Sequence, residues 1–185
     1  MASRGLVILD RDGVINAYEQ GDYICRLQDW IPLPGSIDAI GKLCRAGYQV
    51  AVATNQSGIS RGYYDRAVVD AIHRHLQSLV TRAGGQIDYF AVCPHHPDEA
   101  CLCRKPQAGL LLEIQAHLGL NNLQGSWMVG DSRKDLEAGL AVGCQPVLVT
   151  TTGAGPDTLA GLQGSPLEGI EYADNLSDFV SRLIH

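Results

Sequence analysis

The chain has 185 residues, of which 45% are hydrophobic and 18% are charged. This length predicts one domain, residues 1–185, with a substantial core, and the composition excludes a disordered or low-complexity chain. The formal net charge of -6 excludes a nucleic-acid binder that relies on clustered lysines and arginines, and it means that an anionic substrate would need a local cation such as a divalent metal.

Short apolar runs alternate with amphipathic segments along the chain. The predicted strands are residues 6–9, 50–53, 89–93, 127–129 and 146–149, and the predicted helices are residues 37–44, 68–80, 110–118 and 136–142. The strands lack apolar and polar alternation, so both of their faces are expected to be buried. The order predicts a Rossmann-like α/β fold, a doubly wound parallel sheet with helices on both faces. Residues 150–169 are expected to form a surface loop before a last strand and helix.

Polar clusters follow four of the predicted strands. They are Asp10-Arg11-Asp12-Gly13, Thr54-Asn55-Gln56-Ser57-Gly58, Arg104-Lys105 at the end of a loop of cysteines and histidines, and Gly130-Asp131-Ser132. In doubly wound sheets, ligands bind outside the carboxyl ends of the strands. We therefore expect the four clusters to converge on one edge of the sheet.

Asp10 and Asp12 are the candidate catalytic residues. An ionised aspartate such as Asp10 can attack phosphorus without an activating base. Asp12 points the same way along an extended chain, so it can protonate the leaving alkoxide and later deprotonate the attacking water. Alone, Asp-x-Asp-Gly is also compatible with a capped turn. The other three clusters favour phosphoryl-transfer chemistry.

A magnesium ion is the expected local cation. Asp10, Asp131 and the backbone carbonyl of Asp12 are its candidate ligands, because two carboxylates cannot approach a phosphate dianion unaided. Asp135 lies one helical turn beyond Asp131. It either orients this site from behind the metal ligands or faces solvent, and the sequence leaves both open.

Side chains around the clusters are the candidates for binding a phosphorylated small molecule. Thr54 would bind the transferring phosphoryl oxygens and Lys105 would offset their charge, although each is also compatible with a helix cap or a solvated surface charge. Residues 14–48 are too few for a large cap domain, so loops and a short flap would hold the substrate. The candidate contacts are Thr54, Asn55, Gln56, Ser57, Arg104, Lys105, Tyr18, Gln20 and Tyr23.

Four soft metal ligands lie within one short loop. They are Cys93, His95, Cys101 and Cys103, enough to close a tetrahedral zinc site of the structural kind. Free thiols packed this closely would be prone to oxidation, which favours zinc. His96 competes with His95 as the fourth ligand, and spacing does not choose between them. Because Arg104 and Lys105 come directly after this loop, we hypothesise that zinc fixes where both cations point.

In this order after successive strands, the four clusters resemble the motifs of the haloacid-dehalogenase-like phosphatases, and the resemblance covers almost the whole chain. It implies a magnesium-dependent phosphomonoesterase with an aspartyl-phosphate on Asp10. Residues 54–62, the zinc loop and Arg104-Lys105-Pro106 look most like the D-glycero-D-manno-heptose 1,7-bisphosphate 7-phosphatases of bacterial lipopolysaccharide-core synthesis. The zinc-loop members carry the histidine two residues after the first cysteine, which points to His95.

Two alternatives to a heptose phosphatase stay open. Histidinol-phosphate phosphatases share the zinc loop, including the short Cys-x-His-x5-Cys-x-Cys form that this chain has and many heptose enzymes lack. A zinc-stabilised module could instead bind phosphorylated ligands without turnover, but its Asp10 and Asp12 would then only repel them. Arg104 favours the heptose enzyme, because its guanidinium can hold a second phosphate with a fork of hydrogen bonds.

The N-terminal residues give no signal for export. Residues 1–10 lead into an apolar strand pattern without a basic segment, an apolar stretch and a cleavage site. No apolar run approaches the ~20 residues that cross a bilayer. We therefore expect a cytoplasmic protein that does not bind membranes, and a monomer is the default expectation for its oligomeric state.

Overall fold

The core of the computed structural model, which describes residues 3–19, 21–151 and 155–185, is a six-stranded parallel sheet in the order β3-β2-β1-β4-β5-β6. The strands are β1 (Gly5–Leu9), β2 (Tyr48–Asn55), β3 (Tyr89–Cys93), β4 (Trp127–Gly130), β5 (Gln145–Val149) and β6 (Glu171–Ala173). The helices are α1 (Ser36–Arg45), α2 (Arg66–Arg82), α3 (Gly109–His117), α4 (Arg133–Ala141), α5 (Gly155–Ala160) and α6 (Leu176–Ile184), with the short 3-10 helices η1 (Leu27–Asp29) and η2 (Pro97–Glu99). The predicted doubly wound fold is confirmed.

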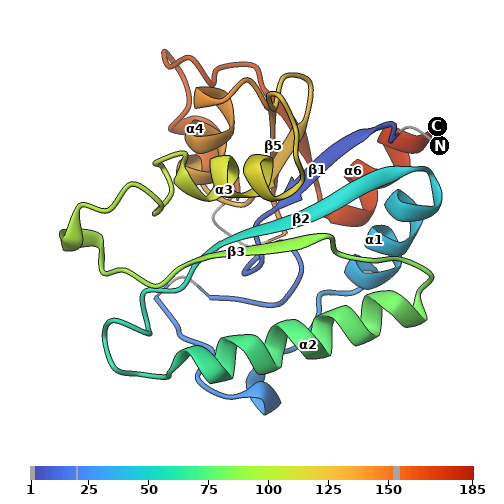
Figure 1. Ribbon diagram of the computed structural model, residues 1–185. Coiled ribbons are helices and arrows are strands. Elements are labelled where there is room, and N and C mark those ends of the chain that lie inside the picture. The colour runs from blue at the N-terminus through green and yellow to red at the C-terminus, as the bar shows by residue number, and fades with distance from the viewer. Residues whose placement is uncertain (1–2, 20, 152–154) are drawn as a thin grey trace.

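Helices cover both faces of the sheet (Figure 1). Val7 and Leu9 of β1 pack in a core with side chains of α1, α2 and α6. Leu6 and Ile8 point to the opposite face, where they meet side chains of α3 and α4. Since successive side chains of a strand alternate between faces, both sets must be apolar. This explains the apolar runs without alternation.

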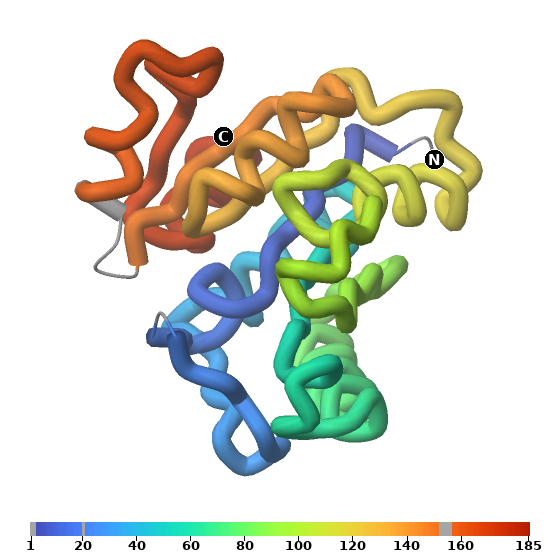
Figure 2. Tube along the Cα trace, turned by 90° about the vertical axis from the view of Figure 1, so that its left-hand side faces the viewer, coloured from blue at the N-terminus to red at the C-terminus, as the bar shows by residue number. Residues whose placement is uncertain are grey.

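The carboxyl ends of the strands meet at one edge, which faces the viewer in Figure 2. Leu9 pairs with Val52 and with Val129, so β1, β2 and β4 end close together. The loops after β2 and β3 are also joined, because the amide of Gln56 donates to the carbonyl of Cys93 at 2.7 Å. The parallel register therefore gathers the polar clusters in one place.

Close packing between β4 and α4 requires a glycine at position 130. A Cβ atom on Gly130 would lie 2.2 Å from Cβ of Asp135, which belongs to the first turn of α4. Real Cβ atoms do not approach this closely. The absence of a side chain at Gly130 thus lets Asp135 reach the end of the sheet.

The prediction for residues 150–169 as a surface loop is wrong in part. This segment contains α5, and its Leu162 and Leu167 are buried against Leu136 and Leu148. The glycines and prolines of the segment suggest a loop, whereas its leucines supply a small apolar cluster of their own. In the described part of the chain between β1 and β2, the helices are η1 and α1, and they form no large cap domain. Among the described residues, no helix is long and apolar enough to span a membrane.

Candidate active site

A cavity of about 820 Å³ lies at the carboxyl edge of the sheet. Each of the four polar clusters contributes to its lining, through Asp10 and Asp12, Asn55, Lys105, and Asp131 with Ser132. The predicted convergence is therefore confirmed. Tyr18 of the flap also lines the cavity, whereas the candidate Gln20 lies outside the described residues.

Lys105 is a deeply buried cation of the site, with a side chain that is 1% exposed. Its Nζ lies 2.9 Å from Oδ1 of Asp10, 2.7 Å from Oδ1 of Asp135 and 2.6 Å from the carbonyl of Ala53. Asn55 fixes the backbone of Lys105, accepting from its amide and donating to its carbonyl, both at 3.1 Å. The alternative of a solvated surface charge is excluded.

The charge of Lys105 is maintained by its neighbours. Burial lowers the pKa of Lys105, but the carboxylates of Asp10 and Asp135 outweigh it and raise the net pKa above its ordinary value. The ammonium therefore stays protonated at neutral pH. A fixed positive charge beside Asp10 suits a site where phosphoryl oxygens gain negative charge.

Three carboxylates crowd around this edge. Oxygens of Asp10, Asp131 and Asp135 lie within 4.8 Å of one another. Burial, followed by repulsion from Asp135, raises the pKa of Asp10 to about 6. Burial, followed by repulsion from Asp10, raises the pKa of Asp131 to about 8. Lys105 offsets the mutual repulsion of these carboxylates only in part, because the net pKa shifts of Asp10 and Asp131 are upward, and such a set of oxygen ligands fits a hard divalent cation such as magnesium.

Asp135 is not a surface residue, which decides between its two alternatives. It is fully buried, and its Oδ2 accepts from the hydroxyl of Ser132 at 2.7 Å and from the Ser132 amide at 3.2 Å. Its other oxygen faces Lys105. Asp135 therefore orients Lys105 and the turn after β4 from behind the cavity.

The carboxylate of Asp12 is held at both oxygens. Oδ1 accepts from Nε and Nη2 of Arg11, at 3.1 and 3.0 Å, and from Nδ2 of Asn16 at 3.0 Å. Oδ2 accepts from Nε2 of Gln56 at 3.0 Å. Charge-assisted hydrogen bonds of this kind fix the direction of a carboxylate. Asp12 is thus aimed at the cavity while remaining 17% exposed.

A smaller hollow of about 130 Å³ adjoins the cavity and is rich in basic groups. Asp12, Tyr18, Asn55 and Lys134 line both spaces. The smaller one is also lined by Gln56, Ser57, Tyr23, Arg61 and Arg104. Thr54 does not line it: this residue is fully buried, and its hydroxyl accepts from Nε2 of Gln56 at 2.8 Å.

Arg104 carries a buried nitrogen that is available to bind an anion. Its Nη1 has no hydrogen-bond partner among the described residues. Unpaired buried donors are costly, so such a group is normally satisfied by a bound molecule or water. Arg61 and Lys134 lie around the same hollow and were not among the predicted contacts. The position of Lys134 in the first turn after Gly130-Asp131 was the signal in the sequence.

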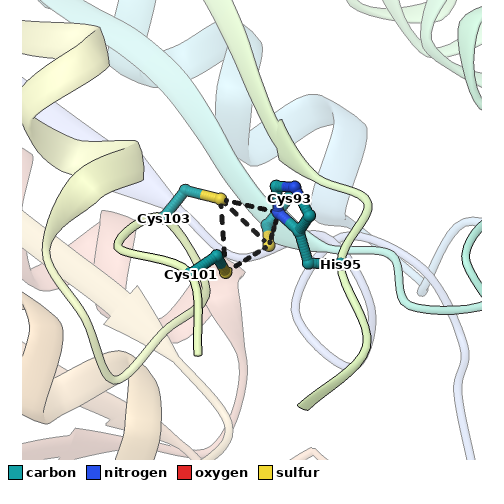
Figure 3. A group of neighbouring side chains, drawn as sticks. All are labelled: Cys93, His95, Cys101 and Cys103. Carbon is teal, nitrogen blue, oxygen red and sulfur yellow. Dashed lines mark hydrogen bonds between the residues drawn. The ribbon is translucent and has the colours of Figure 1, made fainter. Parts of the chain in front are cut away.

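The four predicted soft ligands form a compact cluster (Figure 3). The Sγ atoms lie 3.2 to 3.7 Å apart: Cys93 to Cys103 at 3.2 Å, Cys101 to Cys103 at 3.6 Å and Cys93 to Cys101 at 3.7 Å. Nδ1 of His95 lies 3.5 Å from Sγ of Cys93 and 3.2 Å from Sγ of Cys103. A zinc tetrahedron with ~2.3 Å metal–sulfur bonds has edges of about 3.8 Å, so the residues fit this metal.

His96 is engaged elsewhere. Its Nδ1 accepts from the amide of Asp98 at 3.2 Å, and its own amide donates to Oε1 of Glu99 at 2.7 Å. These bonds cap η2 and leave His95 as the imidazole beside the thiols. At the far end of the loop, the amide of Arg104 donates to Sγ of Cys101 at 3.3 Å, so the cluster is tied directly to the basic hollow.

A doubly wound sheet with an Asp-x-Asp turn, a buried lysine and an acidic pair at its carboxyl edge defines a haloacid-dehalogenase-like hydrolase. Comparison with known families agrees. A model described as polynucleotide kinase 3 phosphatase matches residues 6–139, and one described as HAD-hydrolase-like matches residues 102–179.

Comparison with individual proteins shows which family within this class the chain resembles. The D-glycero-beta-D-manno-heptose-1,7-bisphosphate 7-phosphatase of Pseudomonas aeruginosa is 54% identical over 98% of this chain and 99% of its own length. The D-glycero-alpha-D-manno-heptose-1,7-bisphosphate 7-phosphatase of Mycobacterium bovis is 43% identical over 71% of this chain and 69% of its own. The D,D-heptose 1,7-bisphosphate phosphatase of B. bronchiseptica, solved with magnesium and phosphate, matches with a TM-score of 0.89 and 41% identity over 97% of this chain and 98% of that one. The chain belongs to the heptose-1,7-bisphosphate 7-phosphatase family of haloacid-dehalogenase-like hydrolases.

Proposed function

We propose that this protein is a magnesium-dependent phosphatase that removes the C7 phosphate of D-glycero-β-D-manno-heptose 1,7-bisphosphate. The observation that carries the proposal is the pairing of two sites: a carboxylate-lined cavity with Lys105 at its base, and an adjoining hollow where Arg104 has an unpaired buried nitrogen. A bisphosphate presents an anion to each. The P. aeruginosa relative, named for the β-anomer, supports the choice of anomer.

Asp10 is the proposed nucleophile, and Asp12 is the proposed general acid and base. Asp10 attacks phosphorus, and its new bond replaces the bond between phosphorus and the C7 oxygen. Asp12 gives its proton to the departing alkoxide. In the second half of the reaction, Asp12 takes a proton from a water molecule, and the oxygen of this water attacks phosphorus in the aspartyl-phosphate. The bond between phosphorus and Asp10 breaks, so that phosphate leaves and the Asp10 carboxylate is restored. Lys105 offsets the charge on the transferring oxygens throughout.

Two metals belong to the proposal. Magnesium, when bound, would supply charge neutralisation between the carboxylates and the phosphate, with Asp10, Asp131 and the Asp12 carbonyl as its ligands. The magnesium and phosphate in the solved B. bronchiseptica relative support this assignment. Zinc on the cluster of Cys93, His95, Cys101 and Cys103 would hold the loop that carries Arg104.

The remaining predicted contact residues have different proposed roles. Asn55 positions Lys105, while Tyr18 and Tyr23 offer hydroxyls from the flap to the sugar. Arg104, with Arg61 and Lys134, would receive the C1 phosphate. Ser57 lines the hollow beside Arg104, and the buried Thr54 would act through Gln56, whose Nε2 donates to its hydroxyl, rather than by touching the phosphoryl oxygens. The enzyme would act as a cytoplasmic monomer on a lipopolysaccharide-core precursor.

The substitution Asp10→Asn separates an enzyme from a binding module. We expect it to lower phosphate release by orders of magnitude and to leave substrate binding measurable by calorimetry. Asp38→Asn is the matched control, since Asp38 forms an exposed ion pair with Lys42 on α1. A wild-type protein that binds the bisphosphate but releases no phosphate would support the binding module instead.

A further inference from the structure

Two chains of hydrogen bonds reach Asp12 from opposite sides and end on residues that do not line the main cavity. One runs through Gln56 to Tyr64. The other runs through Arg11 to His73. His73 lines neither space, and Tyr64 lines the smaller hollow but not the cavity that holds Asp10, so the hydrogen bonds of both residues towards Asp12 call for an explanation.

The first chain begins at a tightly packed tyrosine. Tyr64 is 9% exposed, and its hydroxyl donates to Oε1 of Gln56 at 2.7 Å. This bond fixes which end of the Gln56 amide faces Asp12, so that Nε2 is the atom that donates to Oδ2. The ring is itself locked, because a Cβ on Gly58 would lie 2.2 Å from its Cε1.

The second chain begins at a buried histidine. Nε2 of His73 lies 3.4 Å from Nη1 of Arg11, and the ring stacks on Phe90 with centroids 4.4 Å apart. Burial, followed by repulsion from Arg11, lowers the pKa of His73 to about 3, so the ring is neutral and Nε2 can accept from the guanidinium. Arg11, 1% exposed, then presents its other two nitrogens to Oδ1 of Asp12.

We infer that Tyr64 and His73 are positioning residues for Asp12: through Gln56 and Arg11 they hold both of its carboxylate oxygens in the direction that proton transfer to the leaving group requires. The inference rests on the proposed role of Asp12 as general acid. Gln56 is the side chain that holds Oδ2, whereas Arg11 shares Oδ1 with Asn16. A carboxylate that loses the contact at Oδ2 can turn about Oδ1, and one that loses the two bonds from Arg11 is held at Oδ1 by Asn16 alone.

The consequence depends on the leaving group. An alkoxide must receive the proton of Asp12 as its bond to phosphorus breaks, whereas 4-nitrophenolate leaves without protonation. Loss of either chain should therefore slow cleavage of an alkyl phosphate and spare cleavage of an aryl phosphate of similar size. The attack by Asp10 is common to both reactions. kcat/KM isolates this first half, because it covers only the steps up to formation of the aspartyl-phosphate.

The test compares kcat/KM for benzyl phosphate and 4-nitrophenyl phosphate in Tyr64→Phe and His73→Phe. Each variant keeps an aromatic ring at its position and loses the polar contact. We expect about a 10-fold loss on benzyl phosphate and less than about 2-fold on 4-nitrophenyl phosphate, a fraction of the ~10²–10⁴-fold that a general acid supplies. His73→Gln, which restores an acceptor, should recover part of the loss.

Matched controls come from two exposed aromatic side chains of the same protein. His117 stacks on Tyr89, as His73 stacks on Phe90, but it lies at the exposed end of α3, so His117→Phe should behave as wild type on both substrates. Tyr172→Phe on exposed β6 serves in the same way for Tyr64. If either position fails to tolerate the change, as judged by thermal unfolding, the other one still tests its own chain.

Asp12→Asn separates failure of the inference from failure of the proposed function. We expect this variant to lose far more activity on benzyl phosphate than on 4-nitrophenyl phosphate. With that pattern in place, equal losses on both substrates in Tyr64→Phe and His73→Phe, or no loss at all, would overturn the positioning role alone. Equal losses on both substrates in Asp12→Asn itself would overturn the assignment of Asp12 as the acid, and the positioning role with it.

Discussion

Lys105 and Asp10 form a buried ion pair in which Nζ lies 2.9 Å from Oδ1, and they come from residues 95 positions apart in the chain. The pair joins the loop after β3 to the turn after β1, at the base of the main cavity. A second carboxylate, Asp135, lies on the other side of the ammonium. The lysine therefore serves both the folded state and the proposed chemistry.

Replacement of Lys105 by methionine should lower both the stability of the folded protein and its activity. Two buried carboxylates would lose their cation, and removing one partner from a buried pair costs about 3–5 kcal/mol. We expect this loss in the free energy of urea unfolding, measured without metal, together with phosphate release reduced by orders of magnitude. Lys42→Met, which removes an exposed ion pair with Asp38, should cost at most about 1 kcal/mol and leave turnover unchanged. Wild-type stability in Lys105→Met would contradict the buried pair.

His73 predicts how stability responds to acid. Its pKa falls from 6.5 in the unfolded chain to about 3 in the folded protein. The unfolded state therefore binds the proton more readily, so the contribution of His73 is fully present above pH 6.5 and is lost as the pH falls towards 3. Relative to His73→Phe, wild type should lose about 2 kcal/mol of unfolding free energy between pH 7 and pH 5. Parallel pH curves for the two proteins would show that His73 titrates normally in the fold.

Arg104 should govern recognition of the second phosphate. Arg104→Ala should raise KM for heptose 1,7-bisphosphate by about 10- to 100-fold, because charge-assisted hydrogen bonds contribute about 1.5–3 kcal/mol. The variant should leave kcat/KM for 4-nitrophenyl phosphate within a few-fold of wild type, since that substrate has a single phosphate. Arg182→Ala, at the exposed end of α6, is the control. An equal loss on both substrates would place Arg104 at the phosphoryl site rather than in the basic hollow.

Zinc removal should change the position of Arg104 in the smaller hollow, because the zinc cluster holds the loop that carries this residue. The purified protein should contain about one zinc ion per chain by elemental analysis. Cys101→Ser removes a sulfur that also accepts from the amide of Arg104, so we expect a weaker hold on metal and a raised KM for the bisphosphate. Circular dichroism reports whether the sheet persists. A zinc-free protein that keeps its fold and its full kinetics would contradict the hypothesis.

Much of the site was predictable because parallel strands end at a common edge. Asp10 and Asp131 directly follow β1 and β4, so fold class brought them together, whereas Lys105 comes after the loop that follows β3 and is held in place by Asn55. The choice between His95 and His96 was different, because both lie in one loop and spacing allows either. It depended on η2, where the amide of Asp98 donates to Nδ1 of His96 and so engages the second imidazole.

The supporting residues were not predictable from local pattern. His73 sits on the buried stripe of α2 and is indistinguishable there from a core histidine. Tyr64 precedes that helix in a loop, and only tertiary packing brings its hydroxyl to Gln56. Asp135 was ambiguous because a first-turn aspartate is common in exposed helices, and its burial follows from the close approach that Gly130 permits. Contacts made across the fold leave no periodic signal in the sequence.

The most direct test of the proposed function is kcat/KM for phosphate release, with magnesium, from D-glycero-β-D-manno-heptose 1,7-bisphosphate and from histidinol phosphate. We expect a preference of at least ~10²-fold for the heptose, near 3 kcal/mol of differential transition-state binding, with C7 as the site of cleavage. A preference of similar size for histidinol phosphate would contradict the heptose assignment while leaving Asp10, Asp12 and Lys105 in their proposed roles.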